Sequence, residues 1–209
     1  MIVQIPLGIL EANCYLVYDE ASGEGVIVDP GGDTTALRRE IEQRGVKVKA
    51  ILNTHGHFDH SAGNAELASL DIPLGIHPED HDLLTEGGGA AWFGMPEVPT
   101  MQPSIALTEG FEHTVGNLRL RVLETPGHTP GSVCFYIPEE NALLTGDTLF
   151  AGGIGRSDLP GGEPRALTES LARLLTFPPE TIIYPGHGPV STLAQEKRQN
   201  PWLKWIAAR

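Results

Sequence analysis

The chain has few cysteines: Cys14 and Cys134 are the only two among 209 residues. Both lie in apolar runs that are typical of strands, and neither belongs to a metal-binding motif. We therefore expect two buried thiols rather than a disulfide or a thiolate zinc site. Because disulfides are rare in the reducing cytoplasm, this scarcity also predicts a cytoplasmic protein.

Basic side chains are scarce as well. The sequence contains 14 Lys and Arg against 27 Asp and Glu, which gives a formal net charge of −13. Proteins that bind DNA or RNA cluster their positive charges against the phosphates, and the few basic residues here are scattered along the chain. The composition therefore argues against a nucleic-acid partner and against a nuclease.

Long hydrophobic runs are absent too. The N-terminal residues, MIVQIP, lack a basic region and a long apolar stretch, and no segment approaches the roughly 18 apolar residues of a membrane helix. We expect neither a signal peptide nor a membrane partner. Since no charged or low-complexity linker divides the chain, we expect one domain over residues 1–209. The oligomeric state is left open.

A dense group of metal-binding side chains occupies residues 55–60, with the sequence HGHFDH. Histidine is the side chain that most often binds metals, and Asp59 adds a charged oxygen. In an extended strand His60 would point away from the other three ligands, so all four converge only where the chain curls, which Gly56 permits. Four ligands are too many for one tetrahedral zinc with an open position, so the group predicts two adjacent metals. A solvated loop, or a helix N-cap at Asp59, is the simpler alternative.

Three more candidate ligands follow strand-like apolar runs elsewhere in the chain: His128 in TPGHTPG, Asp147 in LTGDT and His187 in YPGHG. Each run breaks into glycine, proline or threonine, which marks a turn. Strands that run in one direction would bring these residues to one edge of a sheet, where open α/β folds place their sites. Singly, Asp147 could cap a helix and either histidine could be a hydrogen-bonded core residue. Together with residues 55–60, however, they use five of the eight histidines.

The four motifs THGHFDH, TPGHTPG, TGD and PGHG resemble those of the metallo-β-lactamase superfamily in identity and order. The resemblance spans nearly the whole chain. It implies an α/β fold, the four-layer αββα sandwich, with two metals at one edge of two facing sheets. The implied ligands of the first metal are His55, His57 and His128. Those of the second are Asp59, His60 and His187. Asp147 and a water or hydroxide would bridge the two divalent ions, with zinc expected first and iron or manganese as alternatives.

Within the superfamily the chain is more similar to short, single-domain glyoxalase II-like proteins. That similarity rests on the segments EANCYLV, FAGGIGRSDLPGG and QNPW. It implies hydrolysis of an acyl thioester, such as S-lactoylglutathione, by a metal-bridging hydroxide, with Asp59 and Asp147 as the catalytic carboxylates. Full-length glyoxalase II has a helical C-terminal domain that supplies much of its glutathione site, whereas only 22 residues follow His187 here. The metal chemistry is therefore expected to carry over, and the glutathione specificity is not.

Other activities stay open at this stage. Persulfide dioxygenases are similar in sequence, share a segment like GRSD, and use one iron on two histidines and one aspartate, here His55, His128 or His57, and Asp147. Flavin-linked diiron proteins carry an extra electron-transfer domain, and from the length of this chain we expect none here. β-Lactam hydrolases commonly have other residues at the positions of His60 and Asp147. The sequence thus favours a thioester hydrolase acting on a small molecule, with the dioxygenase as the alternative.

Two further features are candidates for substrate binding. Residues 87–104 form a long segment rich in glycine and proline that contains Trp92 and Phe93, and loops of this length are often lids or binding segments. The alternative is that both aromatic side chains pack on a helix. Arg156 is the second candidate, because it could pair with a substrate carboxylate or equally with Asp158.

Periodicity and turn residues also predict the secondary structure. Strands are expected over residues 3–7, 14–18, 25–28, 50–52, 74–76, 118–123, 142–144 and 181–184. Helices are expected over residues 33–45, 62–70, 164–176 and 193–208, the last interrupted at Pro201, with a helical turn at 78–84.

Overall fold

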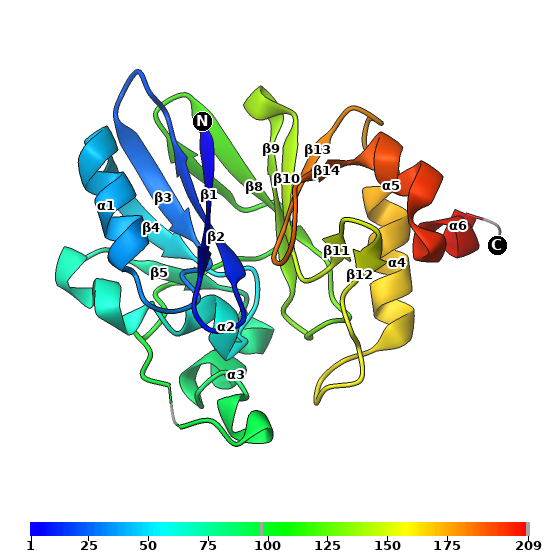
Figure 1. Cartoon of the computed structure of the whole chain (residues 1–209), viewed down its shortest axis with the longest axis horizontal. Coiled ribbons are helices and arrows are strands. Elements are labelled where there is room, and N and C mark those ends of the chain that lie inside the picture. The colour runs from blue at the N-terminus through cyan, green and yellow to red at the C-terminus, as the bar shows by residue number, and fades with distance from the viewer. Residues whose placement is uncertain (97, 208–209) are drawn as a thin grey trace.

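Two β-sheets face each other, and helices cover their outer faces (Figure 1). The computed structural model describes residues 1–96 and 98–207. The first part of the chain builds one sheet with its helices, and the second part builds the other. The predicted four-layer αββα sandwich is confirmed, whereas the expectation of a single domain over residues 1–209 stays a prediction.

The first sheet has the strand order β1-β2-β3-β4-β5-β6. Its strands are β1 (Ile2–Leu7), β2 (Ala12–Tyr18), β3 (Glu24–Val28), β4 (Lys47–Leu52), β5 (Leu74–Ile76) and β6 (Ile105–Ala106). The first three are antiparallel neighbours, and β3 to β6 are parallel. The parallel strands β3 and β4 therefore end at the same edge of the sheet.

The second sheet has the strand order β14-β13-β10-β9-β8-β7. Its strands are β7 (Glu112–Val115), β8 (Leu118–Glu124), β9 (Val133–Ile137), β10 (Ala142–Gly146), β13 (Ile182–Pro185) and β14 (Ser191–Thr192). A separate hairpin contains β11 (Leu149–Phe150) and β12 (Gly153–Ile154). β9 is antiparallel to both β8 and β10, and β10 is parallel to β13, so β8, β10 and β13 run in one direction. The expected strands are confirmed, with ends that differ by at most three residues.

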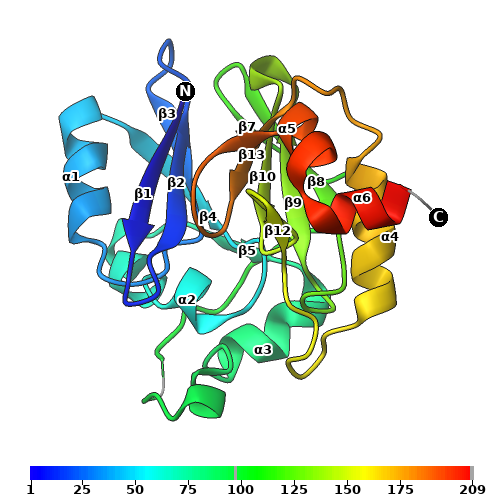
Figure 2. The same ribbon diagram turned by 45° about the vertical axis from the view of Figure 1, so that its right-hand side comes forward.

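The helices are α1 (Thr35–Arg44), α2 (Phe58–Ser61), α3 (His81–Thr85), α4 (Pro164–Leu174), α5 (Leu193–Gln199) and α6 (Pro201–Ala207). Figures 1 and 2 show α1 on the outer face of the first sheet, α4 to α6 on the outer face of the second, and α2 and α3 at one end of the sandwich. The last predicted helix is divided at Pro201, and residue 208 lies outside the described residues. Among the described residues, no helix is long and apolar enough to span a bilayer.

The helix predicted over residues 62–70 was wrong in its limits. The chain instead forms α2 and then a short 3₁₀ helix over Ala65–Leu70. The break lies at Gly63, whose backbone N–H donates to the carbonyl of Pro30 at 2.7 Å and not to a carbonyl of the preceding helical turn. This tertiary contact ends α2 directly after the HGHFDH segment.

Apolar side chains fill the space between the sheets and the space under the helices. Val28 and Leu52 of the first sheet meet Phe135 of the second in the central layer. Leu37 of α1 packs on the outside of the first sheet, and Leu171 of α4 on the outside of the second. Each such fully buried side chain contributes roughly 1.5–3 kcal/mol, so the scaffold is stabilised by residues remote from the strand ends. The predicted buried, free thiols of the two cysteines are confirmed.

Candidate metal centre

The ends of four strands position all seven predicted ligands. His55 and His57 follow β4, and Asp59 and His60 lie in α2 directly behind them. The other three follow the parallel-running strands β8, β10 and β13: they are His128, Asp147 and His187. Gly186 permits this convergence, because a Cβ atom at that position would overlap the carboxylate of Asp147 and come within 2.8 Å of the His60 ring. The structure brings all seven side chains together at one edge of the sandwich.

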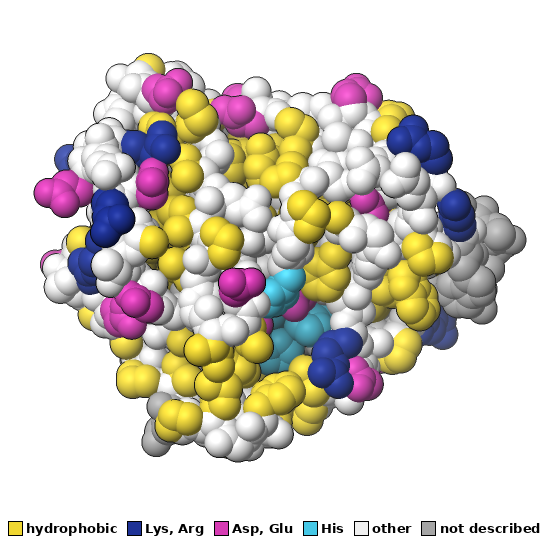
Figure 3. Space-filling model, in the orientation of Figure 1, with side chains coloured by type: hydrophobic (Ala, Val, Ile, Leu, Met, Phe, Trp, Pro, Cys, Tyr) yellow, Lys and Arg dark blue, Asp and Glu magenta, His cyan; other side chains and the backbone are white. Residues whose placement is uncertain are grey.

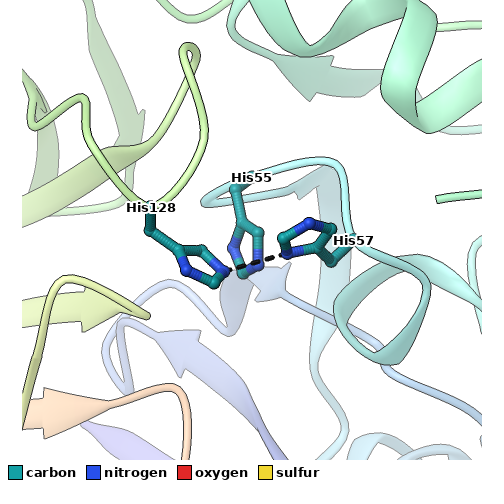
Figure 4. Close-up of side chains that lie close together, drawn as sticks. All are labelled: His55, His57 and His128. Carbon is teal, nitrogen blue, oxygen red and sulfur yellow. Dashed lines mark hydrogen bonds between the residues drawn. The ribbon is translucent and has the colours of Figure 1, made fainter. Parts of the chain in front are cut away.

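Three histidines form the first group, and Figure 4 shows their rings turned toward one another. Ring nitrogens of His55, His57 and His128 all lie within 4.8 Å of one another. Nδ1 of His57 is 2.9 Å from Nε2 of His128, the contact drawn as a dashed line (Figure 4). All three side chains are buried. The group thus presents converging nitrogen atoms away from bulk water.

Hydrogen bonds at the outer nitrogens fix the tautomers of two of these rings. Nδ1 of His128 lies 2.7 Å from the carbonyl oxygen of Arg156, which can only accept, so Nε2 holds the lone pair. Nδ1 of His55 lies 3.0 Å from the hydroxyl of Thr54, and that hydroxyl donates to Asp29 at 2.6 Å. Nδ1 of His55 is therefore the donor, and its Nε2 is a buried lone pair with no partner among the described residues. Both rings turn unprotonated nitrogens toward the centre.

A second group contains Asp59, His60 and His187, whose ligand-type atoms also lie within 4.8 Å of one another. Nε2 of His60 is 3.3 Å from Nε2 of His187, and Oδ2 of Asp59 is 3.2 Å from the same His187 nitrogen. His60 is fully buried, whereas the side chain of His187 is 31% exposed. The second group is therefore the one that opens toward solvent.

Asp147 lies between the two groups. Its Oδ1 is 3.2 Å from Nε2 of His60, and its Oδ2 is 3.6 Å from Nε2 of His128 and 3.8 Å from Nε2 of His187. One carboxylate thus faces the histidines of both groups, which is the arrangement expected of a bridging ligand.

Burial and charge set the protonation of the centre. Burial lowers the pKa of His55 well below its usual range, and burial together with His128 lowers that of His57 to about 4. Burial also opposes protonation of His60, but Asp147 and Asp59 outweigh it and raise its pKa. Burial would raise the pKa of Asp147, yet the neighbouring histidines, His60 first, hold it well below its usual range. The centre thus combines neutral imidazoles at His55 and His57 and an ionised Asp147 with a His60 whose proton the carboxylates favour. A cation that binds to His60 would replace that proton, because a metal binds the neutral ring.

These observations test whether the residues fit two divalent cations. Buried Nε2 atoms of His55 and His57 and Oδ1 of Asp147 have no hydrogen-bond partner among the described residues. A buried polar atom without a partner is costly, and a cation at each group would satisfy these atoms. The donors are nitrogen and oxygen without sulfur, a set that suits zinc, iron or manganese. The residues present fit the implied metals.

Asp29 is a buried residue of the centre that the sequence analysis missed. It follows β3, and its Oδ2 lies 3.0 Å from Nδ1 of His60. Its carboxylate also accepts hydrogen bonds from the backbone N–H and the hydroxyl of Thr54. The signal was visible in the sequence, because an acidic residue directly after an apolar strand and before Pro-Gly repeats the pattern of the other ligands.

Asp80 is a second missed residue, and it joins the two ligand loops. Its carboxylate accepts from the backbone N–H of Gly56 at 2.8 Å, from the hydroxyl of Thr129 at 2.7 Å and from the backbone N–H of Gly131 at 2.7 Å. The side chain is fully buried, and burial raises its pKa. No sequence signal identified it, because its partners lie 24 to 51 residues away.

The two predicted substrate-binding residues lie at the mouth of the centre. The guanidinium of Arg156 makes two 2.7 Å hydrogen bonds with the carboxylate of Asp158, so the internal ion pair that was the alternative is present. These bonds lower the pKa of Asp158 to about 2. The ring of Trp92 is 5.9 Å from the ring of His57 and nearly perpendicular to it, and 44% of the side chain is exposed. Trp92 thus borders the centre from residues 87–104, of which residue 97 lies outside the described residues.

A cavity of about 330 Å³ opens above the metal-binding atoms, and Leu10, Phe93, Arg156 and Leu159 line its walls. Figure 3 shows the histidines in a hollow with hydrophobic side chains on one side and basic and acidic side chains on the other. The remaining histidines do not line this cavity: they are His77, His81 and His113. The volume is of the size of small-molecule sites.

Comparison with known proteins places this geometry in a family. A sequence model described as the metallo-beta-lactamase superfamily matches residues 7–187. The chain is 38% identical to a probable metallo-hydrolase, YqgX, of Bacillus subtilis, with 96% of both chains covered. It is 35% identical to the hydroxyacylglutathione hydrolase GloC of Haemophilus influenzae, over 95% of this chain and 96% of the relative.

Solved structures agree with this placement. TTHA1623 in a di-iron-bound form is 43% identical, with a TM-score of 0.86 and coverage of 96% of this chain and 100% of the other. The BLEG-1 B3 metallo-beta-lactamase is 38% identical, with a TM-score of 0.90 and coverage of 97% and 99%. ETHE1 from Myxococcus xanthus is 28% identical, with a TM-score of 0.78 and coverage of 96% and 83%. With its strand-end cluster of histidines and aspartates, the chain belongs to the metallo-beta-lactamase superfamily.

Proposed function

We propose that the protein is a metal-dependent hydrolase of acyl thioesters, of the glyoxalase II-like kind. The observation that carries the proposal is the position of Asp147, whose two carboxylate oxygens face the histidines of both groups. We assign His55, His57 and His128 to one divalent cation, Asp59, His60 and His187 to a second, and Asp147 to both.

The lining of the cavity supports water as the nucleophile. Among the described residues, neither serine nor cysteine lines it. The two thiols are buried elsewhere, and burial raises the pKa of Cys134 to about 11 and also raises that of Cys14. A covalent acyl-enzyme on a thiolate is therefore disfavoured, because the thiolate is the reactive form.

Two bound cations would supply an acidic water and polarise the ester carbonyl. The chain's own residues do the rest. Asp59 lines the cavity, so its carboxylate is placed to orient the attacking water and to accept its proton. Leu10 and Phe93 give one side of the cavity an apolar surface. In the net reaction one water cleaves the thioester: a C–O bond forms, the C–S bond breaks, the sulfur takes one proton, and the carboxylic acid releases the other.

One relative supports a thioester as the acyl group, since a full-length match at 35% identity carries the name hydroxyacylglutathione hydrolase. We propose a small-molecule substrate, no nucleic-acid or membrane partner, and a cytoplasmic location. The net charge of −13 and the two free thiols support these assignments.

The decisive experiment pairs metal analysis with a thioester assay on the same purified protein. We expect two divalent metal ions per chain, zinc first and iron or manganese as alternatives, and hydrolysis of S-lactoylglutathione that is lost on chelation and restored by metal. Persulfide oxidation is the second candidate, because ETHE1 is a persulfide dioxygenase and its structure covers 96% of the chain. One iron per chain, oxygen consumption with glutathione persulfide and no thioester hydrolysis would establish that candidate and reject the hydrolase.

A further inference from the structure

An apolar pocket of about 630 Å³ lies beside the metal centre. It is enclosed by the turn between β1 and β2, the start of α1, and α2. Most of its lining is hydrocarbon, including Leu7, Ile9, Ala36, Phe58 and Ala62. The polar side chains that also line it are Asp33, Thr35, Arg39 and Asp59. This volume lies within the range of small-molecule sites, which are concave and mostly apolar.

The pocket adjoins the cavity above the metal-binding atoms. Leu10, Phe58 and Asp59 line both spaces. Asp59 is also the residue whose Oδ2 lies 3.2 Å from His187. A molecule whose reacting carbon lies at the metals could therefore extend directly into the pocket, past Asp59.

Glycines build the floor of the pocket by close backbone approach. A Cβ atom at Gly8 would lie 2.6 Å from the carbonyl oxygen of Gly31, and one at Gly32 would lie 2.6 Å from the Cα of Gly8. The β1–β2 turn thus rests on residues 31–32, and its next two side chains stand over the pocket. These are Ile9 and Leu10, which are 74% and 51% exposed. Exposing two large apolar side chains beside an active site is typical of a surface that a ligand covers.

The two sides of the mouth differ in chemistry. The Ile9–Leu10 side is hydrocarbon, whereas the opposite side carries the Arg156–Asp158 ion pair. Biological thiols such as glutathione carry charged carboxylates, which an apolar pocket does not solvate. The acyl limb of a thioester is the part that can be purely hydrocarbon. The hydrocarbon part of the pocket is therefore complementary to the acyl limb.

We infer that the enzyme prefers thioesters with an extended apolar acyl chain, which occupies the pocket under the β1–β2 turn. This inference rests on the proposed thioester hydrolase and specifies its substrate class. A lactoyl group is short and polar and leaves the pocket unfilled. Binding energy from the remote chain would then contribute to the rate at the reacting carbon.

The test is a chain-length series, acetyl to octanoyl, on one thiol with the metal-loaded enzyme. Burying one methylene corresponds to about a threefold to fourfold change, so we expect kcat/KM for the hexanoyl thioester to exceed that for the acetyl thioester by about a hundredfold. A ratio below about threefold would overturn the inference while leaving the hydrolase intact.

Ala36→Phe tests the location of the chain. Ala36 is an exposed residue of α1 that lines the pocket, so a phenyl ring on its Cβ fills the space without entering the core. We expect the hexanoyl-to-acetyl ratio to fall at least tenfold. Ala172→Phe is the matched control, because Ala172 is an exposed helical alanine of α4 outside the pocket, and it should keep the wild-type ratio. Leu10→Gln, which makes the shared wall polar, should also lower the ratio.

A binding experiment separates failure of the pocket from failure of the hydrolase. S-methyl and S-hexyl thioethers of glutathione cannot be hydrolysed, and calorimetry should show tighter binding of the hexyl compound to wild type but not to Ala36→Phe. If this difference appears without thioester turnover, the pocket stands and the proposed reaction fails. Equal affinities in wild type would overturn the pocket assignment. A dimer in sedimentation that Ile9→Ser dissociates would assign the apolar turn to a second copy and also overturn it.

Discussion

Asp29 holds the ring of His60 in one orientation: its Oδ2 lies 3.0 Å from Nδ1 of the imidazole, and both side chains are buried. The carboxylate acts only as an acceptor here, because the backbone N–H and the hydroxyl of Thr54 both donate to it. The proton between the two residues therefore lies on Nδ1, so Nε2 of His60 is the ring nitrogen that faces Asp147 and His187 and would bind a cation. This pair connects the end of β3 to the proposed second metal site.

Asp29→Asn should weaken metal binding without unfolding the protein. The amide of the variant has one acceptor oxygen, so it cannot accept from Thr54 and from the His60 ring as the carboxylate does. His60 then loses its fixed orientation. Losing a partner that orients a metal ligand typically costs about 10–100-fold in metal affinity. Chelator competition on the purified variant measures this loss. Asp82→Asn, at an exposed side chain, is the control and should bind metal as wild type does. Unchanged affinity in Asp29→Asn would show that β3 does not support the site.

Asp147→Ala should abolish hydrolysis while the protein stays folded. A bridging carboxylate offsets the repulsion between two cations. Its removal should lower activity by more than about a hundredfold, because loss of a residue that only hydrogen-bonds to a ligand already costs about 10–100-fold. The near-UV circular dichroism should persist, since the cores under the helices and between the sheets are apolar and lie elsewhere. Loss of that signal in the variant or in the chelated protein would mean that the metals are structural.

Asp80→Asn should destabilise the fold and loosen the ligand loops together. Both carboxylate oxygens accept hydrogen bonds, so the amide NH₂ must face a donor and leave it unsatisfied, at a cost of about 1–3 kcal/mol. Urea unfolding measures the free-energy difference. Glu79→Gln, the exposed neighbour in the same turn, should change stability by less than about 0.5 kcal/mol. Equal midpoints for the two variants would contradict the role of Asp80.

His113→Leu should change the pH dependence of stability. Burial lowers the pKa of His113, so the unfolded chain binds this proton more readily than the folded one. The stability that comes from keeping the ring neutral is present above about pH 6.5 and is lost as pH falls below it, by at most about 1.4 kcal/mol per pH unit. Relative to wild type, the variant should therefore gain stability from pH 8 to pH 5.5 in denaturant titrations. His113→Gln should follow the same trend. If the free energy of unfolding depends on pH in the same way in the variants and in wild type, His113 does not contribute to that dependence.

The thiol portion of the substrate should matter little. Arg156 is half exposed and already paired with Asp158, and exposed pairs of this kind contribute about 0–1 kcal/mol. We expect kcat/KM for one acyl group on glutathione and on a truncated thiol to differ by less than about a hundredfold, near 2.7 kcal/mol, and Arg156→Ala to change the ratio only slightly. A larger preference for glutathione would reveal a thiol site elsewhere on the protein.

Much of the centre could be predicted from the sequence because local chemistry specifies it. Apolar runs that end in glycine, proline or threonine mark where strands stop, and His55, His128, Asp147 and His187 follow such stops. The motifs were also specific enough to imply the αββα layers. By contrast, the helix expected over residues 62–70 failed because a distant carbonyl, that of Pro30, captured the N–H of Gly63.

What the tertiary structure alone decided are the relations between residues far apart in the chain. Asp80 bonds to loops 24 and 51 residues away, and nothing in its neighbourhood marks it as an acceptor for them. The pairing of Arg156 with Asp158 and the pocket beside Asp59 likewise required coordinates. Sequence alone determined which side chains can bind metal, because that is a property of each residue. Only the fold decided which of them meet and what space surrounds them, because distance and burial arise from packing.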